Sequence, residues 1–180
     1  MPDSRASTHT VRNATIADLE AVQAIYAYHV RHGLASFEEI PPDLAEMEQR
    51  FRDITDRGLP YLVAELDGAA RGYAYAGRYR TRPAYRYTLE DTVYVGPAHQ
   101  GRGLGSALLA ELVARCEGLG YRRMVAVIGD SANHASIRLH ERLGFRTCGV
   151  IPSVGFKFGR WVDSVLMERP LGPGDTSLPD

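Results

Sequence analysis

The chain has few cysteines, no long apolar run and almost no net charge, and each of these absences excludes a class of protein. Its two cysteines, Cys116 and Cys148, are too few for a disulfide-stapled secreted domain and are expected to be free thiols. No apolar stretch approaches the ~18 residues that a membrane span requires, so no contact with a membrane is expected. A formal net charge of −1 argues against nucleic-acid binding by the domain as a whole.

The sequence also lacks a metal-binding motif and an apolar segment near its start. His29 and His32 share one face of a predicted helix, but two histidines without a further ligand make a poor metal site. Residues 1–10 contain no apolar core of a secretory signal. We therefore expect a cytoplasmic protein that needs no metal.

The length and composition are those of one ordinary globular domain. The 180 residues are 44% hydrophobic and 24% charged, which is enough apolar material for a substantial core. Residues 1–10 and 171–180 are rich in Ser, Thr, Pro, Gly and Asp, and we expect them to be flexible tails. The domain is thus expected to span residues 11–170.

Hydrophobic periodicity and turn residues predict alternating strands and helices. Strands are predicted at 11–12, 61–66, 71–77, 86–95, 124–128, 145–150 and 162–167. Two helices are predicted early in the chain, the first capped by Thr15 and the second following Pro42, and two more at 104–117 and 133–142. The continuous apolar strand at 124–128 is expected to be buried on both faces. This order predicts an α/β (α+β) fold with a mixed central sheet.

The most informative segment is Leu89 to Ser106, LEDTVYVGPAHQGRGLGS. It combines a strand, a glycine-rich loop and a helix start. The first N–H groups of a helix have no intrahelical partner, and the helix dipole favours negative charge there. The segment therefore predicts a site for a phosphorylated cofactor, with the carboxylate of Glu90 a few residues upstream.

The spacing of the glycines narrows the choice of cofactor. A dinucleotide fingerprint requires G-x-G-x-x-G in an early βαβ unit, and a Walker A loop requires G-K-[ST]; neither is present. Gln100, Gly103 and Gly105 instead resemble the Q/R-x-x-G-x-G/A signature of the GNAT acyl-CoA N-acetyltransferases.

Further segments make the resemblance more specific. The chain is most similar to the phosphinothricin acetyltransferase-like group, whose members acetylate phosphinothricin, methionine sulfone and methionine sulfoximine. The matching segments are 35–39, 74–95, 99–109, 137–145 and 155–163. The resemblance implies one GNAT-fold domain with helices on both faces of the sheet. Asp91 departs from the pattern, which has a small polar residue there, and adds a carboxylate beside Glu90.

The resemblance implies acetyl-CoA as cosubstrate and a set of residues that bind it. The strand before the loop is expected to splay from its neighbour, so that its backbone amides contact the pantetheine arm and the thioester. The glycine loop is expected to hold the diphosphate, and Arg102 either adds charge to a phosphate or is solvated. Asn133 contacts the pantetheine, caps its helix, or does both. The implied residues are Val93, Tyr94, Val95, Gln100, Gly101, Arg102, Gly103, Leu104, Gly105, Ser106, Asn133 and Ser136.

Acetyl transfer to an amine needs a base, because an ammonium ion has no lone pair with which to attack a thioester. Side chains alternate along a strand, so Glu90 and Asp91 point to opposite faces and only one of them can serve. The resemblance selects Glu90. It also places His140 where many relatives have a tyrosine, either as the acid that protonates the leaving thiolate or as a binding residue.

The basic segment RYRTRPAYR at 78–86 suits a small anionic substrate better than a nucleic acid. The resemblance implies that Arg80 and Arg82 bind the acid group of an amino-acid-like amine, with Phe37 and Tyr85 as walls, and that the protein is a homodimer. The sequence leaves two alternatives open. One is acetylation of a peptide or protein amine, and the other is a non-catalytic CoA-binding module.

Overall fold

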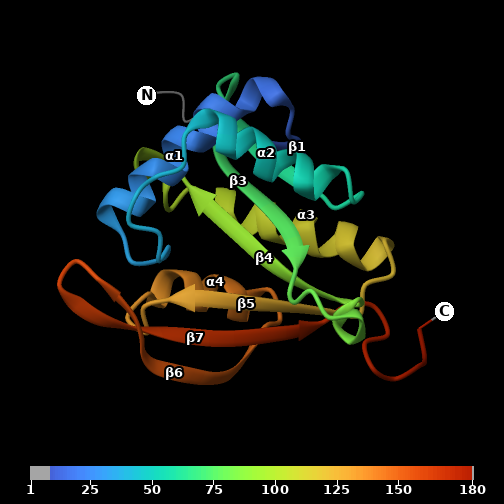
Figure 1. Cartoon of the computed structure of the whole chain (residues 1–180). Helices are drawn as coiled ribbons and strands as arrows, with labels where there is room; N and C mark the ends of the chain where they lie inside the picture. The colour runs from blue at the N-terminus through green and yellow to red at the C-terminus, as the bar shows by residue number, and fades with distance from the viewer. Residues whose placement is uncertain (1–8, 180) are drawn as a thin grey trace, which may run out of the picture.

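The computed structural model describes residues 9–179 and confirms the predicted fold class, a mixed sheet with helices on both faces (Figure 1). Its strand order is β1-β2-β3-β4-β5-β7-β6. The strands are β1 (Thr10–Asn13), β2 (Tyr61–Leu66), β3 (Ala69–Arg78), β4 (Thr88–Val95), β5 (Arg123–Gly129), β6 (Arg146–Lys157) and β7 (Arg160–Pro170). The α-helices are α1 (Leu19–His32), α2 (Leu44–Thr55), α3 (Leu104–Gly118) and α4 (His134–Arg142), and short 3-10 turns cover Ile16–Asp18, Pro83–Tyr85 and Pro97–His99.

The alternation of side chains along the central strands builds two separate cores. Leu62 of β2, Ala74 of β3 and Leu89 of β4 pack with the leucines of α3 on one face. Tyr61 and Tyr73, from β2 and β3, pack on the other face with apolar residues of α1 and α2. Each strand therefore buries both of its faces where helices cover it.

The feature that positions the site is a divergence between β4 and β5. These two strands are parallel and pair only from Thr88↔Arg123 to Glu90↔Val125, whereas β3 stays paired with β4 as far as Val95. In Figure 1 the strands β4 and β5 start together and separate toward their carboxyl ends. The expected splay is therefore present, and the part of β4 beyond Glu90 has no strand partner on its β5 side.

Several predicted elements differ from the structure. The strand predicted at 124–128 is not buried on both faces, because Val127 is 41% exposed and lines a cavity rather than packing under a helix. The strand predicted to start at residue 86 starts at Thr88, since the turn at Pro83–Tyr85 occupies the chain just before it.

The last two strands are longer than predicted. β6 continues to Lys157 and joins β7 through a tight turn in which Phe158 and Gly159 both have positive φ. Its pairing with β7 is irregular between Ile151 and Gly155, where Pro152 and Ser153 resemble strand breakers in the sequence. A bulge thus accommodates residues whose types predicted a loop.

The segment after β7 contacts the rest of the described region. Residues 1–8 and 180 of the predicted tails lie outside the described residues. After β7, Leu171 is fully buried, and the Arg122 side chain donates hydrogen bonds to Gly174, Ser177 and Leu178. Over residues 9–179, the structure contains no helix that is long and apolar enough to cross a membrane.

Candidate active site

Two connected cavities open where β4 and β5 diverge. The smaller has a volume of about 290 Å³ and the larger about 780 Å³. They share six lining residues, which come from the loop after α1, the end of β4, the end of β5 and the start of α4. The shared residues are Ala35, Val93, Tyr94, Gly129, Asn133 and Ser136. A molecule in the larger cleft can therefore reach one in the smaller cavity through the gap between the strands.

The larger cleft contains the glycine loop. Gln100, Gly101, Gly103, Leu104, Gly105 and Ser106 all line it. Gly103 has φ +82° and precedes α3, whose first backbone hydrogen bond runs from the Ala107 N–H to the Gly103 carbonyl at 3.0 Å. The N–H groups before Ala107 are thus available to an anion in the cleft. Gly105 lies where an added Cβ would meet Leu139 at 3.4 Å, so it allows close packing of α3 against α4.

The basic side chains of the larger cleft differ from those that sequence reasoning selected. Arg102 is exposed and does not line the cleft. Arg138 and Arg142, one turn apart on α4, do line it. Their four-residue spacing on one helix is the sequence signal that could have identified them.

The exposed edge of β4 faces the gap. Beyond Glu90, β4 has no strand partner on its β5 side, so the backbone N–H groups of Val93 to Val95 that point there are free to bind a ligand. The carbonyl of Val95 accepts a hydrogen bond from Nε2 of His29 at 2.8 Å. His29, from α1, therefore fixes the end of the splayed strand.

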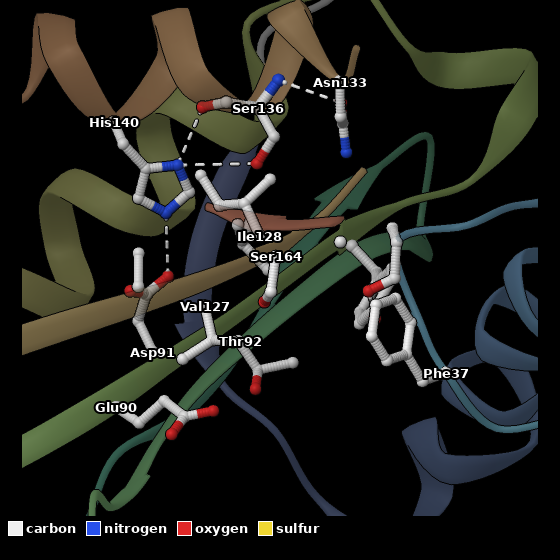
Figure 2. Close-up of a pocket in the computed structure, with 15 residues that line it drawn as sticks. Phe37, Glu90, Asp91, Thr92, Val127, Ile128, Asn133, Ser136, His140 and Ser164 are labelled. Atoms are coloured by element: carbon white, nitrogen blue, oxygen red, sulfur yellow. Dashed lines mark hydrogen bonds and ion pairs between the residues drawn. The ribbon is translucent and has the colours of Figure 1, made fainter. Parts of the chain in front are cut away.

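Glu90 lies in the smaller cavity with Thr92 and Phe37. Burial raises the pKa of Glu90 above its ordinary value, the charge of Asp91 raises it further, and the charge of Arg80 opposes both. A carboxylate with a raised pKa is a stronger base than one in water. Figure 2 shows the side chain of Glu90 pointing away from His140 and that of Asp91 pointing toward it. The predicted alternation of the two carboxylates is therefore present.

His140 is buried beneath the smaller cavity at 2% exposure. Its Nε2 lies 3.0 Å from Oδ2 of Asp91, and its Nδ1 lies 2.8 Å from the carbonyl oxygen of Ser136 (Figure 2). Both ring nitrogens are thus engaged within the protein. Asn133 caps α4 by accepting a hydrogen bond from the Ser136 N–H, and it lines both cavities as well.

The predicted substrate residues of the basic segment are not among the residues that line either cavity. Arg80 stacks on the ring of Tyr79 at 4.2 Å, and Tyr79 packs edge-on against Tyr85. Arg80, Arg82 and Tyr85 are all exposed. Arg80 is nevertheless close enough to Glu90 for its charge to lower the pKa of that carboxyl group.

The loop of residues 33–38 closes the end of the smaller cavity and carries Phe37. Both β5 and β6 have a glycine against this loop. A Cβ on Gly155 would lie 2.4 Å from the Phe37 ring, and one on Gly129 would lie 2.2 Å from the Leu34 carbonyl oxygen. Tyr94 of β4 also contacts this loop, because its hydroxyl donates a hydrogen bond to the Ala35 carbonyl. The two glycines therefore make room for the loop across the divergent strands.

Lys157, the only lysine in the chain, holds this loop in place. Its Nζ is buried and donates hydrogen bonds to the carbonyl oxygens of Gly33 at 2.9 Å and Ser36 at 2.6 Å. Burial lowers the pKa of this amine. Sequence reasoning missed Lys157 because its partners lie more than 120 residues away.

Replacing Lys157 by methionine is expected to destabilise the fold by about 2–6 kcal/mol and to loosen the loop at 33–38. Methionine fills much of the same volume but leaves two carbonyl groups without a donor, at roughly 1–3 kcal/mol for each group that stays buried. Thermal unfolding and hydrogen exchange of the loop amides measure the two effects. Arg160→Met is the control, because Arg160 lies in the same hairpin, is exposed, and has its side chain paired with Asp130. Equal rates of hydrogen exchange for the loop amides in the two variants would contradict this role of Lys157.

In the described part of the chain, no group of three or more His, Cys, Asp or Glu side chains is arranged to hold a metal ion.

Comparison with known proteins gives consistent matches. Residues 22–145 match the model of the acetyltransferase (GNAT) family. The chain is 58% identical over 171 residues to phosphinothricin N-acetyltransferase of Alcaligenes faecalis, covering 95% of this chain and 87% of that protein. It is 42% identical over 162 residues to L-methionine sulfoximine/L-methionine sulfone acetyltransferase of Salmonella typhimurium, covering 90% and 94% of the two chains.

A solved structure supports the same family membership. A GNAT superfamily phosphinothricin acetyltransferase from Sinorhizobium meliloti, in complex with AcCoA, superposes with a TM-score of 0.93 at 49% identity, covering 96% of this chain and 94% of that one. Because the match covers 96% of this chain, few of its residues lie outside the shared fold.

Proposed function

The chain belongs to the GNAT acetyltransferase family, and from this membership we propose that it acetylates the amine of a small amino-acid-like compound with acetyl-CoA as donor. The proposed substrates are phosphinothricin, methionine sulfone and methionine sulfoximine, on which its relatives are named as acting. The observation that carries the proposal is the gap at β4, through which the cavity of Glu90 meets the cleft of the glycine loop.

The residues of the larger cleft fit acetyl-CoA. Gly103 leaves the start of α3 open, and the free edge of β4 offers backbone groups to an extended ligand. We assign the diphosphate to Gln100–Ser106, with Arg138 and Arg142 of α4 as further cations. Val93 to Val95, Asn133 and Ser136 are assigned to the pantetheine arm. Acetyl-CoA supplies an activated acyl group there.

The smaller cavity is assigned to the amine. Glu90 removes a proton from the ammonium form, directly or through water, and frees the lone pair for attack. Free N–H groups of β4 stabilise the negative charge that develops on the attacked carbonyl oxygen. Phe37 forms a wall, and Arg80, Arg82 and Tyr85 are proposed to hold the acid group of the substrate from the rim, where the charge of Arg80 already reaches Glu90. His140 is proposed as the source of a proton for the leaving thiolate.

A panel of amines with acetyl-CoA, followed by thiol release, tests this function. We expect turnover with phosphinothricin, methionine sulfone and methionine sulfoximine. Turnover confined to peptide amino termini would replace the proposed substrate class. Binding of acetyl-CoA without turnover of any amine would indicate a non-catalytic CoA-binding module.

We also propose that the protein is a homodimer built on the hairpin of β6 and β7. Six large apolar side chains on this hairpin are 44–65% exposed. They are Val150, Ile151, Val154, Phe156, Phe158 and Trp161. An exposed apolar patch of this kind at the edge of a sheet is typical of a protein–protein interface. Two copies related by a twofold axis would bury it symmetrically. Phe37, which lines the amine cavity, lies against Gly155 of this hairpin, so a second subunit there would lie beside that cavity.

Trp161→Asp is expected to convert the dimer to a monomer, because it places a charge within the apolar patch, beside Phe156. Sedimentation velocity gives the mass directly. Leu119→Asp is the matched control, since Leu119 is also an exposed apolar residue, at 54%, but lies at the far end of α3. A wild-type protein that sediments as one chain would exclude the dimer.

We also propose a cytoplasmic location and an acetyltransferase domain over residues 11–170. Cys116 and Cys148 are both free thiols, which is consistent with a reducing cytoplasm. The first strand begins at Thr10 and the last ends at Pro170, which is consistent with an acetyltransferase domain over residues 11–170.

A further inference from the structure

Asp91 and His140 form a buried pair whose role the acetyl-transfer scheme above leaves open. The two side chains are each 2% exposed, and the hydrogen bond between Nε2 of His140 and Oδ2 of Asp91 is 3.0 Å long. The other carboxylate oxygen, Oδ1, is also buried and has no hydrogen-bond donor among the described residues. A buried carboxylate needs a compensating partner, and His140 is the one that the structure places there.

The surroundings of the His140 ring decide where its protons lie. A backbone carbonyl only accepts hydrogen bonds, so Nδ1 must carry a proton to bond with the Ser136 carbonyl at 2.8 Å. A carboxylate also only accepts, so Nε2 needs a second proton to bond with Asp91. A neutral histidine has one ring proton and cannot satisfy both neighbours. The geometry therefore favours the doubly protonated imidazolium.

We propose that Asp91 is a positioning residue for acetyl transfer: it keeps a proton on Nε2 of His140, so that the proton His140 releases is the one on Nδ1. The charged hydrogen bond to Asp91 holds the Nε2 proton more strongly than the neutral carbonyl of Ser136 holds the Nδ1 proton. This inference rests on the proposed function, in which His140 supplies a proton to the leaving group.

The position of Ser136 gives the Nδ1 proton a route to the cleft. Its hydroxyl oxygen lies 3.5 Å from Nδ1 and Ser136 lines both cavities. As the carbon–sulfur bond of the thioester breaks, the sulfur gains a proton by way of the Ser136 hydroxyl, and the hydroxyl regains one from Nδ1. His140 ends neutral, with its remaining proton on Nε2 and its hydrogen bond to Asp91 intact.

The other groups around His140 are consistent with this assignment. Burial by itself lowers the pKa of His140, but the hydrogen bond and charge of Asp91 and the Ser136 carbonyl outweigh it, so the pKa is raised. Burial, with the charge of Asp91, raises the pKa of Cys116 on α3 to about 12, so that thiol stays neutral. Phe145, before β6, contacts the ring edge-on, and Ser164 of β7 carries no charge. Glu90 is the other charged group nearby, and it points away from the ring.

Nitrogen NMR of the histidine rings tests the proposal without any turnover. In the wild-type protein without ligands, both ring nitrogens of His140 should be protonated at pH 7, with His140→Gln used to assign the signal. In Asp91→Asn the ring should titrate about one pH unit or more lower, the usual effect of removing an opposite charge at this distance. A wild-type ring that is neutral at pH 7 with a bare Nε2, or an unchanged titration in Asp91→Asn, would overturn the proposal.

The pH profile of kcat gives a second, independent measurement. The alkaline limb reports loss of the His140 proton, so Asp91→Asn should move it to lower pH. The acid limb should also move to lower pH, because the charge of Asp91 raises the pKa of Glu90. Asp18→Asn is the matched control: Asp18 is another buried carboxylate, paired with Arg12 far from the cavities. It should lower stability and leave both limbs in place.

These outcomes separate the inference from the proposed function. If Asp91→Asn does not fold, Asp91→Ser restores the small polar residue of the family pattern and is tested in the same way. The NMR result for the wild-type protein tests the proposal without either variant. Turnover of amines by an enzyme whose His140 is neutral contradicts only the role of Asp91. Absence of turnover with an imidazolium at His140 contradicts the proposed function instead.

Discussion

Glu90→Gln is expected to lower kcat by roughly 10²–10⁴-fold, the usual contribution of a positioned acid or base. Glutamine keeps the shape of the side chain in the amine cavity but cannot accept the proton of the attacking ammonium. Steady-state kinetics with a saturating amine measures the loss. The affinity for acetyl-CoA, measured by calorimetry, should hardly change, because Glu90 lines the smaller cavity and not the larger cleft.

The pH dependence makes this prediction more specific. Glu90 must be ionised to act, and burial and the charge of Asp91 raise its pKa. Activity of the wild-type enzyme should therefore fall as the pH drops through a value above the ordinary range for glutamate. In Glu90→Gln that acid limb should disappear, and raising the pH should recover part of the rate because the solvent then supplies more free amine.

A matched control and a competing residue complete the test. Glu65→Gln alters a half-buried strand glutamate of β2, which pairs with Arg12, and should leave kcat unchanged. If Asp91→Asn removes the acid limb while Glu90→Gln keeps it, the assignment of the base is wrong. If neither substitution matters, the amine arrives neutral, and the enzyme works by positioning and oxyanion stabilisation alone.

The parts of the fold that the sequence predicts well are those fixed by local patterns. Asp67 and Gly68 between two alternating strands predict the hairpin of β2 and β3, and both residues adopt positive φ there. The far end of β6 was not predicted, since its bulge at Pro152–Gly155 is stabilised by pairing with β7 and not by strand-forming residues. Non-local pairing thus outweighs local propensity in this strand.

The candidate site likewise contains some residues that local sequence predicts and others that only the fold brings together. The glycine loop and Glu90 follow from one contiguous segment, and alternation places Glu90 and Asp91 on opposite faces. The loop at 33–38, Lys157 and the pairing of Asp91 with His140 depend on residues 49 to 124 positions apart in the chain. No periodicity or spacing in the sequence brings those groups together, so only the folded chain reveals them.

Gly103→Val is expected to weaken acetyl-CoA binding by about 100-fold or more while the domain stays folded. A Cβ on Gly103 points into open space at the start of α3, where its nearest neighbour is His9 at 4.0 Å. Valine would occupy the approach to the free N–H groups of the helix. Losing two hydrogen bonds to a charged ligand, at roughly 1.5–3 kcal/mol each, corresponds to about this loss of affinity. Calorimetric titration with acetyl-CoA measures it.

Gly120→Val separates this effect from backbone strain. Gly120 follows α3 at its other end, has the same φ of +82° as Gly103, and also has open space around it. Both substitutions force valine into a left-handed conformation, so both should lower the melting temperature by a similar amount. Only Gly103→Val should weaken acetyl-CoA binding, because only Gly103 lines the larger cleft. Equal affinities in the two folded variants would remove the diphosphate from the start of α3 and, with it, the assignment of the larger cleft to acetyl-CoA.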